Sequence, residues 1–203
     1  MAYPGIGAMA EQVCVPLNRL KKIPENMSFN NASGFPMVYT TSYYALKQRS
    51  GLMPREKLLI LGASGGLGFT AVELGKLMGA EVIAAASSEE KLQFAKKAGA
   101  DYLVNYCDGE LKTKIKELTN GKGADVIFDP VGGDLFEQAT RCINWNGRLL
   151  VVGFASGKIP KYKANLALLK GASMVGVFLG RWMKEEPEAY DANFNELLEY
   201  FKQ

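Results

Sequence analysis

The stretch Leu61–Phe69, LGASGGLGF, carries three of its glycines within four consecutive residues. It follows the continuous apolar run of residues 57–62 and overlaps residues 66–78, in which apolar side chains recur every three or four positions. A continuous apolar run is typical of a strand buried on both faces, and the second spacing is typical of an amphipathic helix. The stretch is therefore predicted to be a tight glycine-rich turn that leads from a buried strand into a helix.

The same alternation of strand and helix continues along the chain. We expect strands at residues 57–62, 81–87, 101–106, 124–132, 148–154 and 173–180, and helices at residues 31–50, 66–78, 88–99, 109–121, 133–147 and 186–203. Six strands with helical crossovers predict the α/β class, with a Rossmann-type, doubly wound parallel sheet of strand order 3-2-1-4-5-6. A further short strand is expected at residues 11–16.

The glycine stretch fits the G-x-G-x-x-G template, with Ala63 at the first position, Gly65 at the second and Gly68 at the third. Gly65 would let a pyrophosphate approach the backbone, and Gly68 would let the helix pack closely on the strand. The free N–H groups at the helix start, through Gly66 and Leu67, would hold the phosphates. A purely structural turn is the alternative, but the strand before the stretch and the helix after it favour dinucleotide binding.

The end of the second strand indicates which dinucleotide is bound. NAD sites usually carry an acid there, about 20 residues after the glycines, and this strand ends at Ala86 without one. Glu89 and Glu90 follow the strand end and suit the first turn of the next helix. Ser87 can donate a hydrogen bond to a 2′-phosphate, and Lys91 can supply a cation worth about 1.5–3 kcal/mol. The pattern favours NADP, although Lys91 could also be an ordinary solvated helix residue.

Composition excludes several other classes of protein. The chain has 203 residues, of which 48% are hydrophobic and 22% charged, as in an ordinary globular protein. Its net charge of +3 comes from scattered lysines and arginines, which argues against a nucleic-acid partner. No apolar run reaches the roughly 18 residues of a membrane span. Cys14, Cys107 and Cys142 lie far apart, which favours a reducing, cytoplasmic location.

The sequence contains no histidine. This absence excludes a Ser-His-Asp triad, a Cys-His pair and a His-ligated catalytic zinc, and we expect no metal. The chemistry must come from a cofactor or from other side chains, and no catalytic residue stands out.

Three blocks of sequence, residues 54–106, 128–157 and 165–180, together resemble the quinone oxidoreductase (zeta-crystallin-like) branch of the medium-chain dehydrogenase/reductase superfamily. The absence of histidine agrees with its zinc-free members. The resemblance implies NADPH as the cofactor and hydride transfer to a quinone or an α,β-unsaturated carbonyl. Two alternatives remain: an enoyl-thioester reductase of the same superfamily, or an NADPH-binding module without turnover.

The resemblance also implies roles for particular residues. Lys91 and Tyr106 would bracket the 2′-phosphate, Val131 would lie near the cofactor ribose, and Phe154 and Thr41 would lie on the nicotinamide side. Each has a structural alternative, because Tyr106 could cap the third strand, Phe154 could be a core residue and Thr41 could belong to a helix start.

Members of the family begin with a GroES-like β domain and continue past the last helix seen here. We therefore expect residues 1–30 to be a remnant of that domain and residues 31–203 to be the NADP-binding Rossmann domain, so that the chain is shortened at both ends. The apolar last strand, residues 173–180, is expected at the sheet edge, where it could pair with a second copy to form a homodimer.

Overall fold

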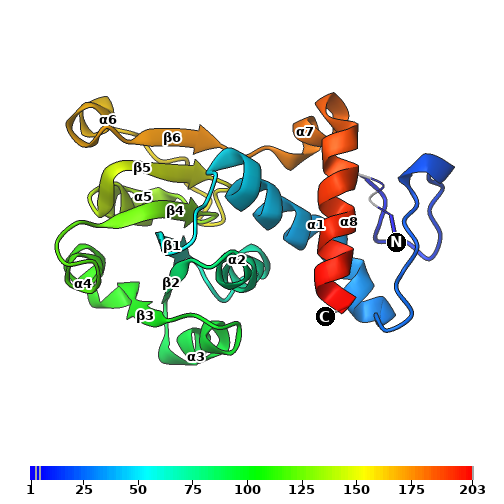
Figure 1. Ribbon diagram of the computed structural model, residues 1–203, viewed down its shortest axis with the longest axis horizontal. Helices are drawn as coiled ribbons and strands as arrows, with labels where there is room; N and C mark the ends of the chain where they lie inside the picture. Colours follow the sequence, from blue (N-terminus) through cyan, green and yellow to red (C-terminus); the bar gives the residue numbers. More distant parts are fainter. Residues whose placement is uncertain (3, 5, 203) are drawn as a thin grey trace. The chain divides into compact units, whose positions relative to one another are not determined.

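A computed structural model describes residues 1–2, 4 and 6–202 of the chain (Figure 1). Their contacts group the chain into two compact units, which are Ser42–Phe178 and the combination of Met1–Thr41 with Leu179–Gln203. The predicted division into residues 1–30 and 31–203 refers to the domains of the family, which contacts within this chain do not test. It stays a prediction.

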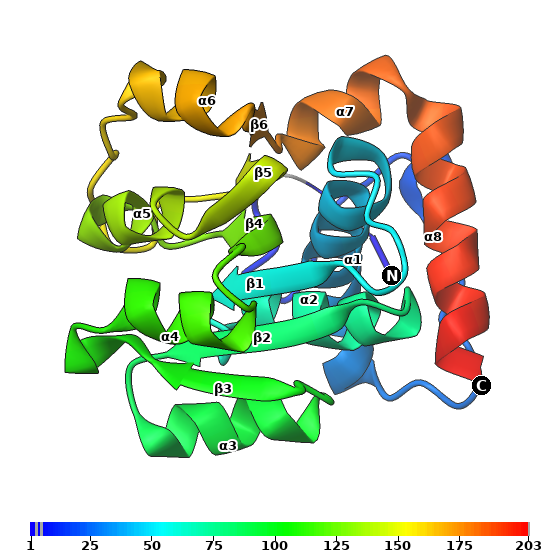
Figure 2. The ribbon, with the colours of Figure 1, turned by 60° about the vertical axis from the view of Figure 1, so that its left-hand side comes forward.

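The larger unit is built on a six-stranded parallel sheet (Figure 2). Its strands are β1 (Lys57–Leu61), β2 (Glu81–Ala86), β3 (Tyr102–Asn105), β4 (Ala124–Asp129), β5 (Ile143–Val151) and β6 (Ser173–Gly176). They lie in the order β3-β2-β1-β4-β5-β6, which confirms the predicted Rossmann-type topology. The winding reverses between β1 and β4, and ligands of open α/β sheets bind at the carboxyl ends of the strands at such a switch point.

Helices connect the strands and cover both faces of the sheet. In the larger unit they are α2 (Gly66–Leu77), α3 (Glu89–Lys97), α4 (Leu111–Leu118), α5 (Gly133–Thr140) and α6 (Ala164–Lys170), with short turns η2 (Ala45–Arg49) and η3 (Tyr106–Asp108). Figure 1 shows α2 and α3 on one face and α4 and α5 on the other. The smaller unit contains η1 (Leu17–Arg19), α7 (Leu179–Glu185) and α8 (Pro187–Lys202), and α1 (Phe29–Tyr44) runs through the division after Thr41.

The three central strands are buried almost along their whole length. Every residue of β1 and β2 after the first is buried, as is all of β4 except its second residue. One side of the sheet packs Leu59, Ile83 and Ile127 against Phe136 of α5 and Ile115 of α4. Burying an aliphatic or aromatic side chain of this size contributes about 1.5–3 kcal/mol, which explains why these strands are continuous apolar runs.

Four sequence-based assignments are wrong. Residues 11–16 form no strand, and the chain near them makes only an isolated bridge between Ala2 and Leu20. The predicted helix 133–147 ends at Thr140, and residues 143–147 already belong to β5. The predicted strand 173–180 ends at Gly176 and leads into α7, and α6 lies where the sequence predicts no regular structure. Residues 143–147 and 177–180 show the physical reason, because a short apolar segment fits helix and strand alike and neighbouring elements decide between them.

An ion pair joins the start of β1 to β5. Arg148 donates from both terminal nitrogens to Glu56, over 2.8 Å and 2.7 Å, and its Nε donates to the carbonyl oxygen of Ser50. Burial raises the pKa of Glu56, but hydrogen bonds from Arg148 and the Met53 N–H, together with the arginine charge, bring it below its ordinary value. The ionised pair therefore stabilises the fold above the ordinary glutamate pKa, and this contribution is lost as the pH falls.

We predict that Glu56→Gln lowers the free energy of unfolding by about 1–2 kcal/mol at pH 7, since the pair is charged, bidentate and partly screened by solvent. The difference from the wild type should begin to shrink as the pH falls below the ordinary glutamate pKa. It should vanish only below the lowered pKa of Glu56 in the fold, where the folded wild-type carboxylate is protonated as well. Urea unfolding of the two proteins at several pH values measures the loss of unfolding free energy and its dependence on pH. Lys158→Met is the control, because its ion pair with Asp134 is largely exposed. An equal loss in both variants would contradict the assignment.

Candidate dinucleotide-binding site at the switch point

The glycine stretch forms a compact turn between β1 and α2. Gly62 has a positive φ of 60°, and its carbonyl oxygen accepts the N–H of Gly65 over 3.0 Å. The N–H of Ala63 donates to the carbonyl oxygen of Ala85 at the end of β2, over 3.0 Å. Gly65 is the N-cap of α2, and no side chain caps this helix. The turn therefore presents the first N–H groups of α2 without a side-chain acceptor.

The glycines of the turn differ in what the protein itself requires of them. A Cβ atom on Gly68 would lie 2.2 Å from the carbonyl oxygen of Gly62, so α2 could not pack on the end of β1 with a larger residue there. Gly65 has an ordinary φ of −76°, is exposed, and would place a Cβ no closer than 3.4 Å to another atom. Packing within the fold therefore explains why residue 68 is a glycine, but it does not explain why residue 65 is one.

Gly62 is a residue that the sequence analysis missed, because the template placed Ala63 at its first position. A Cβ on Gly62 would lie 2.9 Å from Cγ2 of Val131, and the positive φ disfavours any side chain there. Gly62 therefore marks where the turn after β1 touches the turn after β4. The sequence signal that could have identified Gly62 is its position directly after the apolar run of residues 57–61.

The start of α2, like those of α4, α5 and α6, has no side-chain cap, whereas the starts of α3 and η3, after β2 and β3, have one. Ser88 caps α3 by accepting the N–H of Lys91, over 3.4 Å, and the side chain of Asn105 accepts an N–H at the start of η3. Of the three starts that follow β1, β2 and β3, only that of α2 lacks such a cap. The N-terminus of a helix carries a partial positive charge, so uncapped N–H groups there suit an anion such as a phosphate.

The residues predicted around the 2′-phosphate lie at the carboxyl ends of β2 and β3. Lys91 Nζ donates to Ser87 Oγ over 2.9 Å, so the structure brings this pair together. Tyr106 follows Asn105, which is paired with Ala86 in the parallel register of β2 and β3. Ser87 and Tyr106 thus follow directly on two paired strand ends. The position of Ala86 carries no acidic side chain that would repel a phosphate.

Val131 and Phe154 lie on the other side of the switch point, after β4 and β5. Val131 is close to Gly62, as described above, and Phe154 packs on Gly132, where a Cβ would meet its Cδ1 at 3.0 Å. The Phe154 side chain is 41% exposed, so it is not an ordinary core residue. The structure therefore places Val131 beside the glycine turn, and Phe154 against Gly132, the residue that follows Val131.

Thr41 belongs to the smaller unit, and its role on the nicotinamide side stays a prediction. Its hydroxyl donates to the carbonyl oxygen of Met37 over 2.7 Å within α1. The next residue, Ser42, belongs to the larger unit and was not singled out from the sequence. Its Oγ lies 2.9 Å from Thr70 Oγ1 and donates to the carbonyl oxygen of Leu67, so it supports the first turn of α2.

Other side chains bear on metal and thiol chemistry. Among the described residues, no group of three or more His, Cys, Asp or Glu side chains is placed to hold a metal ion. Cys14, Cys107 and Cys142 are all free thiols, and burial raises the pKa of the Cys142 thiol to about 12. None of the helices among the described residues has the length and apolar character that crossing a membrane requires.

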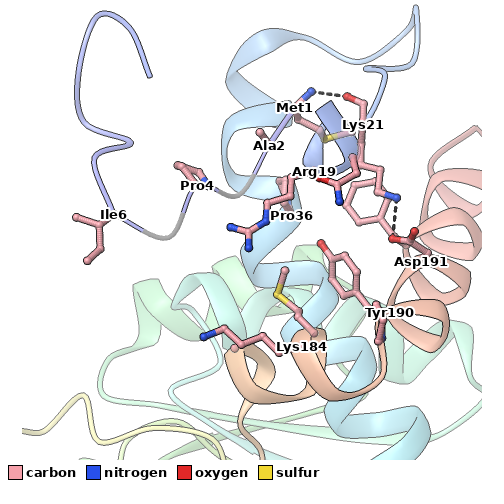
Figure 3. Close-up of a pocket in the computed structure, with 15 residues that line it drawn as sticks. Met1, Ala2, Pro4, Ile6, Arg19, Lys21, Pro36, Lys184, Tyr190 and Asp191 are labelled. Carbon is pink, nitrogen blue, oxygen red and sulfur yellow. Dashed lines mark hydrogen bonds and ion pairs between the residues drawn. The ribbon is translucent and has the colours of Figure 1, made fainter. Parts of the chain in front are cut away.

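The smaller unit contains a cavity of about 620 Å³ (Figure 3). Its lining combines apolar side chains such as Met1 and Phe194 with the ion pair between Lys21 Nζ and Asp191 Oδ1, which are 2.7 Å apart. None of the residues predicted to bind the cofactor lines this cavity. We therefore assign it no part in the candidate dinucleotide site.

Comparison with known proteins agrees with this geometry. Residues 66–196 match the family model described as zinc-binding dehydrogenase. The chain belongs to this family. It is 42% identical to the quinone oxidoreductase-like protein 2 homolog of Nematostella vectensis over 97% of this chain and 54% of that protein. It is 37% identical to quinone oxidoreductase-like protein 2 of Bos taurus over 98% of this chain and 58% of that protein.

Solved structures extend the comparison to the fold. The quinone oxidoreductase of Thermus thermophilus, whose structures include a complex with NADPH, is 30% identical with a TM-score of 0.82, over 95% of this chain and 60% of that chain. These matches confirm the resemblance to the quinone oxidoreductase branch of the medium-chain dehydrogenase/reductase superfamily. The chain spans little more than half the length of the relatives that it matches.

We predict that Gly68→Ala and Gly65→Ala differ sharply in stability. The alanine at position 68 would collide with backbone and should cost about 1–3 kcal/mol or more, whereas the alanine at position 65 should stay within about 0.5 kcal/mol of the wild type. Thermal unfolding followed by circular dichroism compares the two variants. Similar melting temperatures for both would show that the contact between α2 and β1 does not constrain the fold as described.

Proposed function

We propose that this chain is the cofactor-binding part of an NADPH-dependent oxidoreductase. The observation that carries the proposal is Gly65. It stands at an uncapped helix start at the switch point, and neither its φ nor any neighbouring atom requires a glycine there. A glycine at such a position leaves room for a ligand to approach the backbone. The NADPH complex of the related Thermus thermophilus enzyme supports the choice of ligand.

The residues at the switch point fit an NADPH molecule laid across it. The N–H groups of Gly66, Leu67 and Gly68 would hold the pyrophosphate, which Gly65 admits to the backbone. Ser87, Lys91 and Tyr106 would hold the 2′-phosphate at the ends of β2 and β3. Val131 would lie near the cofactor ribose, and Phe154 and Thr41 would lie on the nicotinamide side. These assignments follow the two mononucleotide-binding halves of the Rossmann sheet.

The preference for NADPH over NADH would rest on charge. The Lys91 ammonium already lies against Ser87 Oγ, so both groups are placed to contact one phosphate. A charge-assisted hydrogen bond contributes about 1.5–3 kcal/mol, which corresponds to roughly 10- to 100-fold in affinity. A carboxylate at Ala86 would cancel this gain, and the chain has none there.

Bound NADPH would supply a hydride, which we propose passes to a quinone or an α,β-unsaturated carbonyl. The names of the relatives support a quinone acceptor. The task of this chain would be to hold and orient the cofactor, and we assign no catalytic residue in it. We also propose that zinc takes no part, because the chain has no histidine, and that the protein works in the reducing environment of the cytoplasm.

We predict that Lys91→Ala weakens NADPH binding about 10- to 100-fold and leaves NADH binding within about twofold of the wild type. The reason is that only NADPH carries the phosphate that Lys91 would neutralise. Nicotinamide fluorescence titrations of the purified chain with both cofactors measure the two affinities. Lys96→Ala removes an exposed cation from the same helix and serves as the control, expected to leave both affinities unchanged.

Equal binding of NADPH and NADH by the wild type would contradict the NADP assignment while leaving the fold intact. Binding of neither cofactor would contradict the proposed function itself. A wild type that binds NADPH but does not reduce 1,4-benzoquinone would support the alternative of an NADPH-binding module without turnover, for the chain alone.

We further propose that two copies associate through β6. This strand is at the edge of the sheet and pairs only with β5 among the described strands. Large apolar side chains are exposed around it: Trp145 at 64%, Leu168 at 82%, Met174 at 49% and Phe178 at 72%. An exposed apolar edge strand can add a strand from a second copy, and a patch of this kind marks an interaction surface.

We predict that the wild type sediments as a dimer at micromolar concentrations and that Met174→Lys shifts it to monomer, because a lysine on an edge strand opposes strand pairing. Analytical ultracentrifugation of both proteins measures the mass. Leu77→Lys is the control, since Leu77 is 64% exposed at the end of α2 and away from β6. A monomeric wild type would overturn the proposed interface.

A further inference from the structure

Asp129, the last residue of β4, organises the turns after two neighbouring strands. It is 2% exposed, and its Oδ1 accepts the N–H groups of Val131 over 2.8 Å and Gly132 over 2.9 Å. Its main-chain carbonyl oxygen accepts the N–H groups of Val152 and Gly153, over 2.9 Å and 3.3 Å, where the chain leaves β5. One buried residue therefore fixes the direction of the chain after both β4 and β5.

Backbone hydrogen bonds continue this connection beyond Asp129. The N–H of Ala155 donates to the carbonyl oxygen of Pro130, and the N–H of Ser156 donates to that of Val131, each over 3.0 Å. The N–H of Gly133 donates back to the carbonyl oxygen of Lys158 over 3.1 Å. The two turns are thus joined along their length and should move as one piece.

This joined pair of turns carries Val131, which lies beside the glycine turn, and Phe154. Val131 is close enough to Gly62 to exclude a Cβ there, and Phe154 lies against Gly132. The main-chain conformation of this segment is unusual, since Gly132 and Gly133 have φ values of 70° and 60°. Glycine adopts such dihedrals readily but is equally free to leave them, so hydrogen bonds to other residues are needed to hold one conformation, and Oδ1 of Asp129 accepts two of them.

We propose that Asp129 is a positioning residue for the nicotinamide half of the cofactor. It is buried behind the turns and would act by holding Val131 and Phe154 in place, without touching the cofactor. The inference rests on the proposed function, because only a dinucleotide laid across the switch point would have a half on this side. It adds a residue that none of the sequence patterns singled out.

The feature that matters should be the acceptor atom rather than the negative charge. Burial raises the pKa of the Asp129 carboxyl, by more than the hydrogen bonds from Gly132 and Val131 lower it, so the charge is disfavoured there. An asparagine offers an oxygen of the same reach without a charge. An alanine leaves two N–H groups without that acceptor.

The experiment compares Asp129→Ala, Asp129→Asn and a matched control, Asp125→Ala. Asp125 lies near the amino end of the same strand and also accepts a backbone N–H, that of Lys57 over 2.8 Å, together with the side-chain amide of Asn144 over 2.6 Å. Three ligands separate the halves of the site: NADPH, 2′,5′-ADP for the adenosine half and nicotinamide mononucleotide for the other half. Calorimetry and NMR titration measure the affinities, and thermal unfolding measures stability.

We expect Asp129→Ala to bind NADPH at least about tenfold more weakly and to lose nicotinamide mononucleotide, while 2′,5′-ADP stays within about twofold. Asp129→Asn should restore binding to within about threefold of the wild type. Asp125→Ala should lose stability and keep all three affinities. In the wild type, adding nicotinamide mononucleotide should shift the amide NMR signals of Val131 and Gly132. This measurement does not depend on whether any variant folds.

Equal losses of NADPH and 2′,5′-ADP in Asp129→Ala would overturn the inference in favour of a general effect on folding. Unchanged NADPH binding in Asp129→Ala would overturn the inference as well. So would a wild type that binds NADPH but whose Val131 and Gly132 amide signals do not shift when nicotinamide mononucleotide is added. A wild type that binds none of the three ligands would instead contradict the proposed function, so the two failures are distinguishable.

Discussion

The close contact between the first turn of α2 and the end of β1 is the constraint on which the rest of the site depends. A Cβ on Gly68 would come within 2.2 Å of the Gly62 carbonyl oxygen, so backbone packs directly on backbone. This contact fixes the start of α2 at the carboxyl end of β1, the strand at which the winding of the sheet reverses. The uncapped N–H groups of the helix therefore face the switch point, where an anion gains from both the donors and the helix dipole.

The two sides of the switch point are built differently. After β2 and β3 the chain places polar groups, the Ser87–Lys91 pair and Tyr106, next to strand ends in parallel register. After β4 and β5 it places a rigid pair of turns tied to the buried Asp129. A dinucleotide has a charged adenosine end, with its extra phosphate in NADPH, and a nicotinamide end whose orientation decides hydride transfer. Polar donors suit the first end, and fixed turns suit the second.

The sequence predicts much of this architecture because the central strands are buried on both faces. Continuous apolar runs mark β1, β2 and β4, and the four-residue spacing of Ser87 and Lys91 at a helix start brings that pair together. The sequence patterns did not identify Gly62, because its role is a long-range contact with Val131. They did not identify Asp129 either, because the two N–H groups that it accepts come together only once the turn has formed. Residues 143–147 read as helix, although Ile143 pairs with Ala124 of β4 and the strand continues from there, with a register shift before Arg148. Long-range contacts therefore decided what local patterns left ambiguous.

Hydrogen–deuterium exchange of the purified chain, with and without NADPH, tests the central claim most directly. The account predicts slower exchange on NADPH binding in peptides that cover Gly62–Thr70, at the start of α2, and in peptides that cover the ends of β2 and β4. Peptides from α8 and from residues 6–21, which border the cavity of the smaller unit, should exchange at the same rate in both samples. Protection confined to those latter peptides, or no protection at saturating NADPH, would contradict a cofactor site at the switch point.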